Sequence, residues 1–165
     1  MSTHSVSRPS QGLSILFLSG FLLFTLAIGW TGGAVTAPNI PTWYAGLAKP
    51  SFNPPNWLFM PVWTTLYVLM AIAAWRIWRR LGIGNFTMAL WLFQLTLNFA
   101  WSFIFFGAHQ PMAAFFELTV MWVAILLTMI AFLRIDTLAG LLLLPYLAWV
   151  SFAGVLNFWI WQLNP

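Results

Sequence analysis

The stretch from Met112 to Leu133, "MAAFFELTVMWVAILLTMIAFL", contains one charged residue, Glu117, and is otherwise almost entirely apolar. A helix of about 20 apolar residues spans the hydrocarbon core of a bilayer. Hydrocarbon offers no water to bind backbone N–H and C=O groups, so a run of this length must satisfy them internally as a helix. Strands of a membrane barrel would alternate apolar and polar residues over about 10 positions, which this stretch does not. It therefore predicts a transmembrane helix.

Four other stretches have the same length and apolar character. Together with the first they predict spanning helices over about residues 13–35, 57–78, 86–106, 112–133 and 138–163. The first connection is long, about residues 36–56, and the others are short. We therefore predict an all-α membrane protein, a single domain over residues 1–165, in which five transmembrane helices form a bundle and the long first loop acts as a lid. The first segment is longer than the apolar core of a signal peptide, which favours a retained span over cleavage.

The composition agrees with lipid as the main solvent. Of the 165 residues, 62% are hydrophobic and 5% are charged, whereas a soluble domain has about 25% charged residues. The net charge of +4 comes from few residues without a basic stripe, so nucleic-acid binding is not expected. The absence of cysteine excludes disulfides, thiolate catalysis and thiolate metal sites.

The distribution of positive charge predicts an orientation. In a five-span arrangement Arg8, the cluster Arg76–Arg80 and Arg134 fall on one side, while Lys49 and His109 fall on the other. Lysine and arginine are enriched in cytoplasmic loops. The N-terminus is therefore predicted to be cytoplasmic, with the long loop and the C-terminus on the opposite side.

Acids and histidines are few and do not have the spacing of a catalytic or metal site. Glu117 is a functional candidate because an ionisable group inside a span is costly to bury, but its place near one end favours a structural or interfacial role. Asp136 is predicted to be a turn or helix-cap residue. His4 and His109 have no partner at metal-ligand spacing, so no metal site is predicted. Nucleophile motifs and glycine-rich phosphate loops are also absent.

Aromatic residues are the main chemical feature, with 12 tryptophans and 16 phenylalanines. Tryptophans near segment ends are typical of the membrane interface. Others lie further inside, where an indole N–H needs an acceptor. These interior tryptophans are Trp63, Trp101, Trp122 and Trp149.

Helical periodicity places aromatic and amide side chains on shared faces of three segments. The stripes are Trp63, Tyr67 and Met70 on the second segment, Gln94, Asn98, Trp101 and Phe105 on the third, and Tyr146, Trp149, Ala153 and Leu156 on the fifth. Buried amides such as Asn98 and Asn157 often join helices. Alternatively, they orient a guest in a cavity with flat aromatic walls, which would suit a large planar apolar molecule.

The first connection continues into the second segment as "WYAGLAKPSFNPPNWLFMPVW", Trp43–Trp63. Its prolines stiffen the chain and remove N–H donors, and its aromatic residues can fold back over the bundle as a lid. Lys49 would meet either an anionic lipid headgroup, the simpler interpretation, or a carboxylate on an amphipathic ligand.

Four motifs resemble the translocator protein family, also called the tryptophan-rich sensory protein or peripheral benzodiazepine receptor family. They are "PTWYAGLAKPSFNPPNWLFMPVWTTLY" in the first loop, "QLTLNFAWSFIFFG" in the third segment, and "PYLAW" and "LNFWIW" in the fifth. The resemblance covers about residues 13–162. It implies a five-helix bundle, often a homodimer in the membrane, with a pocket that opens on the side of the first loop.

The resemblance also implies ligands and site residues. The expected function is that of an integral membrane sensory or transport protein that binds protoporphyrin IX, haem or isoquinoline carboxamide-type drugs, with no tightly bound cofactor. The alternatives are a light-dependent protoporphyrin-degrading enzyme, in which Trp63 and Trp149 would be catalytic, and a sterol or lipid transporter. Carried over position by position, the ligand-binding residues are Tyr44, Pro54, Phe59, Trp63, Tyr67, Asn98, Trp101, Trp149, Ala153 and Leu156.

One departure from the family pattern concerns sterols. The family's sterol motif has a tyrosine and, four positions on, a basic residue, where this chain has Phe158 and Gln162. Such motifs are weak evidence even when complete. Their absence argues against tight sterol recognition by this route and is in keeping with a bacterial membrane.

Overall fold

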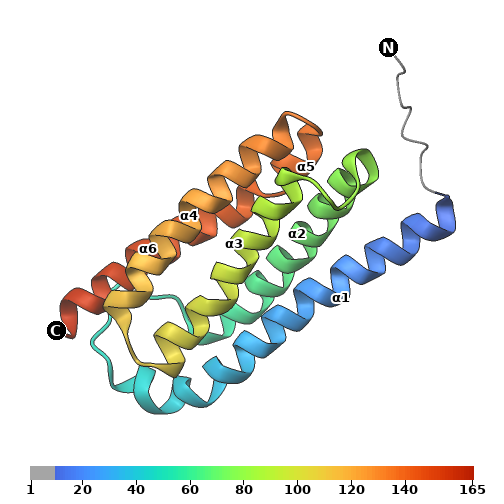
Figure 1. Ribbon diagram of the computed structural model, residues 1–165. Helices are drawn as coiled ribbons and strands as arrows, with labels where there is room; N and C mark the ends of the chain where they lie inside the picture. The colour runs from blue at the N-terminus through green and yellow to red at the C-terminus, as the bar shows by residue number, and fades with distance from the viewer. Residues whose placement is uncertain (1–9) are drawn as a thin grey trace.

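The computed structural model describes residues 10–165, so His4 and Arg8 lie outside the described residues. Five long helical segments lie side by side (Figure 1). The elements are α1 (Gln11–Thr36) with η1 (Ala37–Asn39) and η2 (Ile40–Tyr44), η3 (Asn56–Leu58) with α2 (Phe59–Leu81), α3 (Phe86–Ser102) with η4 (Phe103–Gly107), α4 (Pro111–Leu133), and α5 (Thr137–Leu141) with α6 (Leu144–Leu163). Within the described residues, five such segments are long and apolar enough to cross a membrane. The predicted all-α, five-span architecture is confirmed.

The first span is longer than the sequence pattern indicated. Instead of ending near residue 35, the backbone stays helical through η1 and η2 to Tyr44. Pro38 and Pro41 lie in these two irregular turns. Each lacks the N–H that a regular α-helix would use, but the fixed φ of proline is compatible with a helical backbone. The connection to η3 is thereby reduced from about residues 36–56 to residues 45–55.

The last span is interrupted rather than continuous. α5 ends at Leu141 and α6 begins at Leu144, with Pro145 in the first turn of α6. Proline has no N–H to give to the carbonyl four residues earlier, and its ring clashes with that carbonyl. The sequence between Leu141 and Leu144 therefore turns before the helix resumes.

The helices pack in a ring. α1 packs on α2 and α3, α3 packs on α4, and α4 packs on α5 and α6. α2 packs closely on the short α5 but diverges from α6. The seam between α2 and α6 is consequently the most open in the ring.

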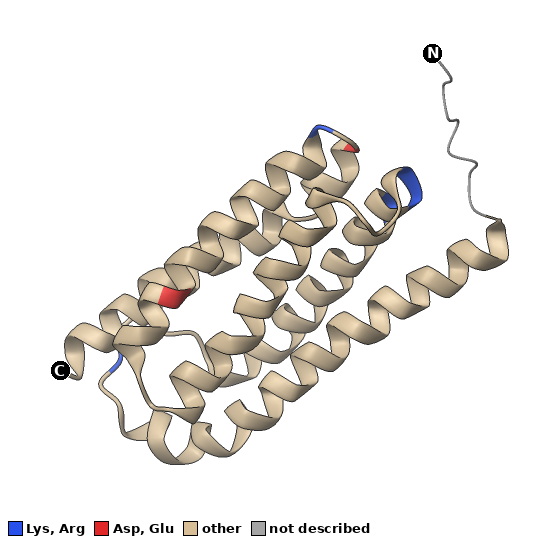
Figure 2. Ribbon diagram, in the orientation of Figure 1, with Lys and Arg blue, Asp and Glu red and all other residues tan. Residues whose placement is uncertain are grey.

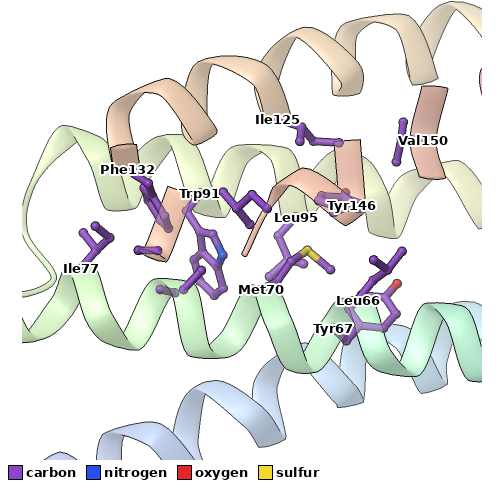
Figure 3. Close-up of a cluster of buried hydrophobic side chains, with 14 of the residues drawn as sticks. Leu66, Tyr67, Met70, Ile77, Trp91, Leu95, Ile125, Phe132, Tyr146 and Val150 are labelled. Atoms are coloured by element: carbon purple, nitrogen blue, oxygen red, sulfur yellow. The ribbon is translucent and has the colours of Figure 1, made fainter. Parts of the chain in front are cut away.

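Side chains from α2, α3, α4 and α6 meet in the main hydrophobic core (Figure 3). The largest fully buried side chains include Trp91, Tyr146 and Phe132. Apolar residues on the outside, such as Trp30 and Leu23 of α1, are 83% and 71% exposed. In a soluble protein these side chains would be unfavourable, but in a bilayer they contact acyl chains.

Most of the charged residues in the described part of the chain gather at one end of the bundle. Arginines at the C-terminal end of α2 and in the turn between α4 and α5 lie at the same end, and Lys49 lies at the other (Figure 2). Asp136 joins the two arginine-bearing segments, because it accepts hydrogen bonds from Arg76 Nη2 at 2.8 Å and Arg80 Nη2 at 3.0 Å. It also caps α5, accepting from the N–H of Ala139 at 3.0 Å, as predicted for a cap residue.

The surroundings of Asp136 set its ionisation. Burial alone would raise the pKa of Asp136, but the N–H of Ala139 and the guanidinium groups of Arg76 and Arg80 outweigh burial. They hold that pKa below its usual value, so the carboxylate is ionised at neutral pH.

Candidate ligand-binding site

A chain of buried polar groups crosses the middle of the bundle. Tyr67 of α2 donates its hydroxyl to Asn98 Oδ1 of α3 at 2.6 Å, and Asn98 Nδ2 donates to the hydroxyl of Tyr146 on α6 at 3.0 Å. The Tyr146 hydroxyl in turn approaches Met121 Sδ of α4 at 3.7 Å. Asn98 therefore joins helices in this structure, which is one of the two roles that the sequence left open.

A second polar chain lies closer to the end of the bundle covered by the loop. Trp101 Nε1 donates to Asn157 Oδ1 at 3.2 Å, and Asn157 Nδ2 donates to the carbonyl of Pro111 at 2.8 Å. The Trp101 ring stacks on Phe105 with their centroids 4.9 Å apart. The expected acceptor for a buried indole is thus present for Trp101.

Aromatic rings line the seam between α2 and α6. Trp63 lies 5.8 Å from Tyr67 and 6.2 Å from Tyr146 between ring centroids. Trp149 lies 5.9 Å from Phe59 and 5.5 Å from Phe152. Both tryptophans are half-buried and pack against the main core. The Nε1 atom of Trp149 is buried and has no hydrogen-bond partner among residues 10–165.

The same seam carries an apolar groove of about 540 Å³. Its lining residues are Leu58, Pro61, Val62, Thr65, Leu66, Leu69, Pro145, Ala148, Trp149 and Phe152. The groove lies where α2 and α6 diverge. Trp149 is therefore one of the residues that border this groove.

The connection over residues 45–55 lies across the end of the bundle near the C-terminus of α6 (Figure 1). Asn164 binds the backbone of this loop through two hydrogen bonds. Its side chain accepts from the N–H of Ala48 at 3.0 Å and donates to the carbonyl of Ala48 at 2.9 Å. Phe52 packs edge-on against Phe152, 6.3 Å away. The loop covers the aromatic seam at this end.

Lys49 forms hydrogen bonds within its own loop. Its ammonium group donates to the carbonyls of Leu47 at 2.9 Å and Ala45 at 3.4 Å, and lies 4.6 Å from the centre of the Tyr44 ring. The Tyr44 hydroxyl donates to Asn53 Oδ1 at 2.8 Å. A role in loop structure was not anticipated from the sequence, which pointed to a lipid headgroup or a ligand carboxylate.

A stacked pair of aromatic rings lies just before the loop, at the end of the first span. The rings of Trp43 and His109 are parallel within 15° and 4.3 Å apart, and His109 Nε2 is 2.9 Å from Asn39 Oδ1. His109 thus connects the end of the first span to the turn between η4 and α4.

The residues predicted for the pocket lie in four places. Tyr44 and Leu156 are buried in a second hydrophobic cluster with Phe105, Phe106, Ala114 and Ile160, and Phe59 packs against it. Tyr67 and Asn98 belong to the buried polar chain, and Trp63, Trp101, Trp149 and Ala153 pack half-buried around the main core. Pro54 is half-buried in the loop, where its carbonyl accepts from Asn53 Nδ2 at 3.1 Å.

Sequence reasoning missed Phe152 and Asn164. Phe152 follows Trp149 by three positions, so helical periodicity contained the signal for it. Asn164 lies beyond the end of α6, and its role depends on where the loop passes in space.

Comparison with known proteins agrees with this architecture. Residues 21–162 match the TspO/MBR family. The chain is 44% identical to the tryptophan-rich protein TspO of Chlorobaculum tepidum, covering 92% of this chain and 98% of that protein. It is 45% identical to the tryptophan-rich protein TspO of Archaeoglobus fulgidus, covering 92% and 99%, and 39% identical to the translocator protein of Sus scrofa, covering 84% and 89%.

Proposed function

Because the chain belongs to the TspO/MBR family and is a multi-pass integral membrane protein, we propose that it binds planar, largely apolar ligands of the porphyrin class. Protoporphyrin IX or haem would lie among the aromatic side chains of α2, α3 and α6, beneath the loop over residues 45–55. Sensing or transport would follow from this binding.

The observation that supports the proposal best is that three half-buried indoles, Trp63, Trp101 and Trp149, pack against the main core. That core also contains Tyr67 and Tyr146, the two hydrogen-bond partners of the buried Asn98. Flat aromatic faces offer a planar guest large contact areas, and a few amides or hydroxyls orient it. The Nε1 of Trp149, which has no partner in the described part of the chain, is a donor that an acceptor on the ligand would satisfy.

In the present structure these aromatic rings pack on one another, with centroids about 5.5–6.2 Å apart at the seam. A porphyrin must therefore displace side chains or move the loop before it is enclosed. Rearrangement of a loop on binding is common where the covering segment makes few contacts. Asn164, Phe152 and Tyr44 supply polar or aromatic contacts to this loop.

The carboxylates of protoporphyrin IX set its orientation. Burying an unpaired carboxylate in hydrocarbon is strongly unfavourable. The propionates are therefore expected at the loop end, where water and headgroups are close, with the apolar edge pointing toward Tyr67 and Tyr146.

The direct test is a titration of the purified protein with protoporphyrin IX, followed by quenching of tryptophan fluorescence. Trp149→Phe and Ala153→Thr should each weaken binding, the first by loss of contact area and the second by overfilling the site. Trp30→Phe is the matched control, because Trp30 is 83% exposed on α1. Unchanged affinity in both site variants would show that the pocket lies elsewhere.

Light-dependent degradation of the bound porphyrin is a second candidate, favoured by the position of Trp63 and Trp149 on the same seam. The chemistry would come from the excited ligand and dioxygen, while the protein holds the ligand and limits access. Porphyrin absorbance under illumination tests this. A decay that is no faster with protein than in detergent alone would rule it out.

A further inference from the structure

Glu117 lies on the inward face of α4. It is one turn from Ala114 and one turn from Met121, which are 0% and 2% exposed, and residues three or four apart share a helix face. Both carboxyl oxygens of Glu117 are buried. The carboxyl group therefore points into the bundle. Of the structural or interfacial role favoured by the sequence, the interfacial part does not fit this position.

Neither oxygen of Glu117 has a hydrogen-bond partner among residues 10–165. The hydroxyl and indole donors of the two polar chains bind other acceptors: Tyr67 donates to Asn98, Tyr146 to Met121, and Trp101 to Asn157. The side chains of Arg76 and Arg80 bind Asp136 at the far end of the bundle. Lys49 binds carbonyls of its own loop.

A carboxyl group without a donor is unfavourable inside a membrane protein. An unmet buried acceptor costs about 1–3 kcal/mol, and more when it is charged. Polar groups at such positions characteristically face a ligand pathway or a cavity. Glu117 also lies one turn from Met121, which contacts the Tyr146 hydroxyl of the proposed site.

We infer that Glu117 is a specificity residue, which accepts a hydrogen bond from an N–H group on the edge of a planar aromatic ligand. The inference rests on the proposed function, since it concerns a ligand among Trp63, Trp101 and Trp149. The chemical class is an aromatic heterocycle of the pyrrole or indole kind with an outward-facing N–H. Glu117 retains an acceptor oxygen whether it is ionised or protonated.

Two kinds of planar ligand differ in whether their N–H groups can reach Glu117. In a closed porphyrin ring the N–H groups point into the centre of the macrocycle, so a carboxyl at the edge does not reach them. In a heterocycle with an outward N–H, the same carboxyl is a suitable partner. Glu117 should therefore discriminate among edge-donor ligands while affecting protoporphyrin IX little.

Carbazole and dibenzofuran are a matched pair of probes, because they have the same flat tricyclic shape and differ by an N–H in place of an oxygen. Their affinities are measured by tryptophan quenching or by competition with protoporphyrin IX, and corrected for partition into protein-free detergent. The wild-type protein should prefer carbazole by about tenfold, the effect of one hydrogen bond to a carboxylate.

Glu117→Leu should abolish this preference, so that carbazole and dibenzofuran bind with about equal affinity, because leucine offers no acceptor. Glu117→Gln keeps a neutral carbonyl oxygen and should give an intermediate ratio, since bonds to charged acceptors are roughly twice as strong. Glu117→Gln also provides the test if the leucine variant does not fold. Thr119→Val is the control, because Thr119 is exposed on the same helix and its change should leave the ratio intact.

A wild-type ratio near one, or a ratio that neither Glu117 variant changes, would overturn the inference. If protoporphyrin IX binds but neither tricyclic probe does, the inference fails alone. If protoporphyrin IX does not bind either, the proposed function fails with it.

Discussion

The ring of Tyr67 packs directly on Gly29, so that a β-carbon at Gly29 would overlap the Cε2 and Cδ2 atoms of the tyrosine. This close approach brings α2 against α1 and holds the tyrosine in place for its hydrogen bond to Asn98. Gly29 thereby supports the centre of the site from the first span, although it has no side chain of its own.

Gly29→Ala should therefore displace Tyr67 and disturb the buried polar chain. Forcing an extra methyl group into a packed contact costs about 1–3 kcal/mol. Thermal unfolding in detergent measures the loss. Gly33→Ala is the matched control, because a β-carbon there meets nothing within 4 Å and alanine favours the helix. Equal stability of the two variants would contradict this account of Gly29.

Asn98→Leu should destabilise the protein by about 2–4 kcal/mol, because it removes two buried hydrogen bonds and leaves the Tyr67 hydroxyl without its acceptor. The Tyr146 hydroxyl retains its contact with Met121. Chemical or thermal unfolding reports the change, and a double-mutant cycle with Tyr67→Phe measures the pairwise part. Thr96→Val, on the exposed side of α3, should have little effect. A small loss for Asn98→Leu would mean that water replaces the amide.

Asn164→Ala should loosen the loop without unfolding the bundle, since it removes both side-chain bonds to Ala48. Hydrogen exchange and protease cleavage within residues 45–55 should increase, because local opening follows the loss of local contacts. Rates of porphyrin association and release should both rise. Gln162→Ala, an exposed position near the same helix end, is the control. Unaltered exchange in the Asn164 variant would show that Phe52 and Lys49 suffice to hold the loop.

Stability should fall in acid because of Asp136. Its pKa in the folded protein is lower than in the unfolded chain, so its ionised form favours folding. That contribution is complete above about pH 5, where the unfolded carboxyl is also ionised, and is lost as the pH falls through the folded pKa.

Asp136→Asn should consequently reduce stability by about 1–3 kcal/mol at neutral pH, where it breaks the pairs with Arg76 and Arg80. The difference from wild type should shrink as the pH falls below about 4. Unfolding temperatures between pH 3 and 7 measure this. Arg79→Gln removes a charge from the same end of α2 and should keep the acid-dependent loss, because Arg79 lies over the Trp75 ring. A pH-independent difference would exclude the ion pairs as its cause.

Several features of the site followed from residue pattern. The stripes on the second, third and fifth segments predicted which aromatic rings face inward, because a helix repeats its faces every 3.6 residues and that rule is local. Trp63, Trp101 and Trp149 all pack on the core. The capping role of Asp136 was also local, since it involves a backbone N–H three residues away.

Other features depended on partners far apart in the chain. The sequence indicated a structural or interfacial role for Glu117 and a lipid or ligand partner for Lys49. The structure turns Glu117 inward and attaches Lys49 to its own loop. The extension of the first span to Tyr44 also escaped the pattern, because prolines usually mark the end of a helix rather than successive helical turns.

Sequence alone determined that this chain is a five-span helical membrane protein with aromatic interior faces, because length, apolarity and period are properties of each segment by itself. Tertiary structure alone decided which polar groups meet: Asn98 with Tyr67 and Tyr146, Asn164 with Ala48, and Glu117 with no donor within residues 10–165. The physical reason is that a buried hydrogen bond forms only where two separate helices, or a helix and a loop, bring donor and acceptor within about 3 Å of each other.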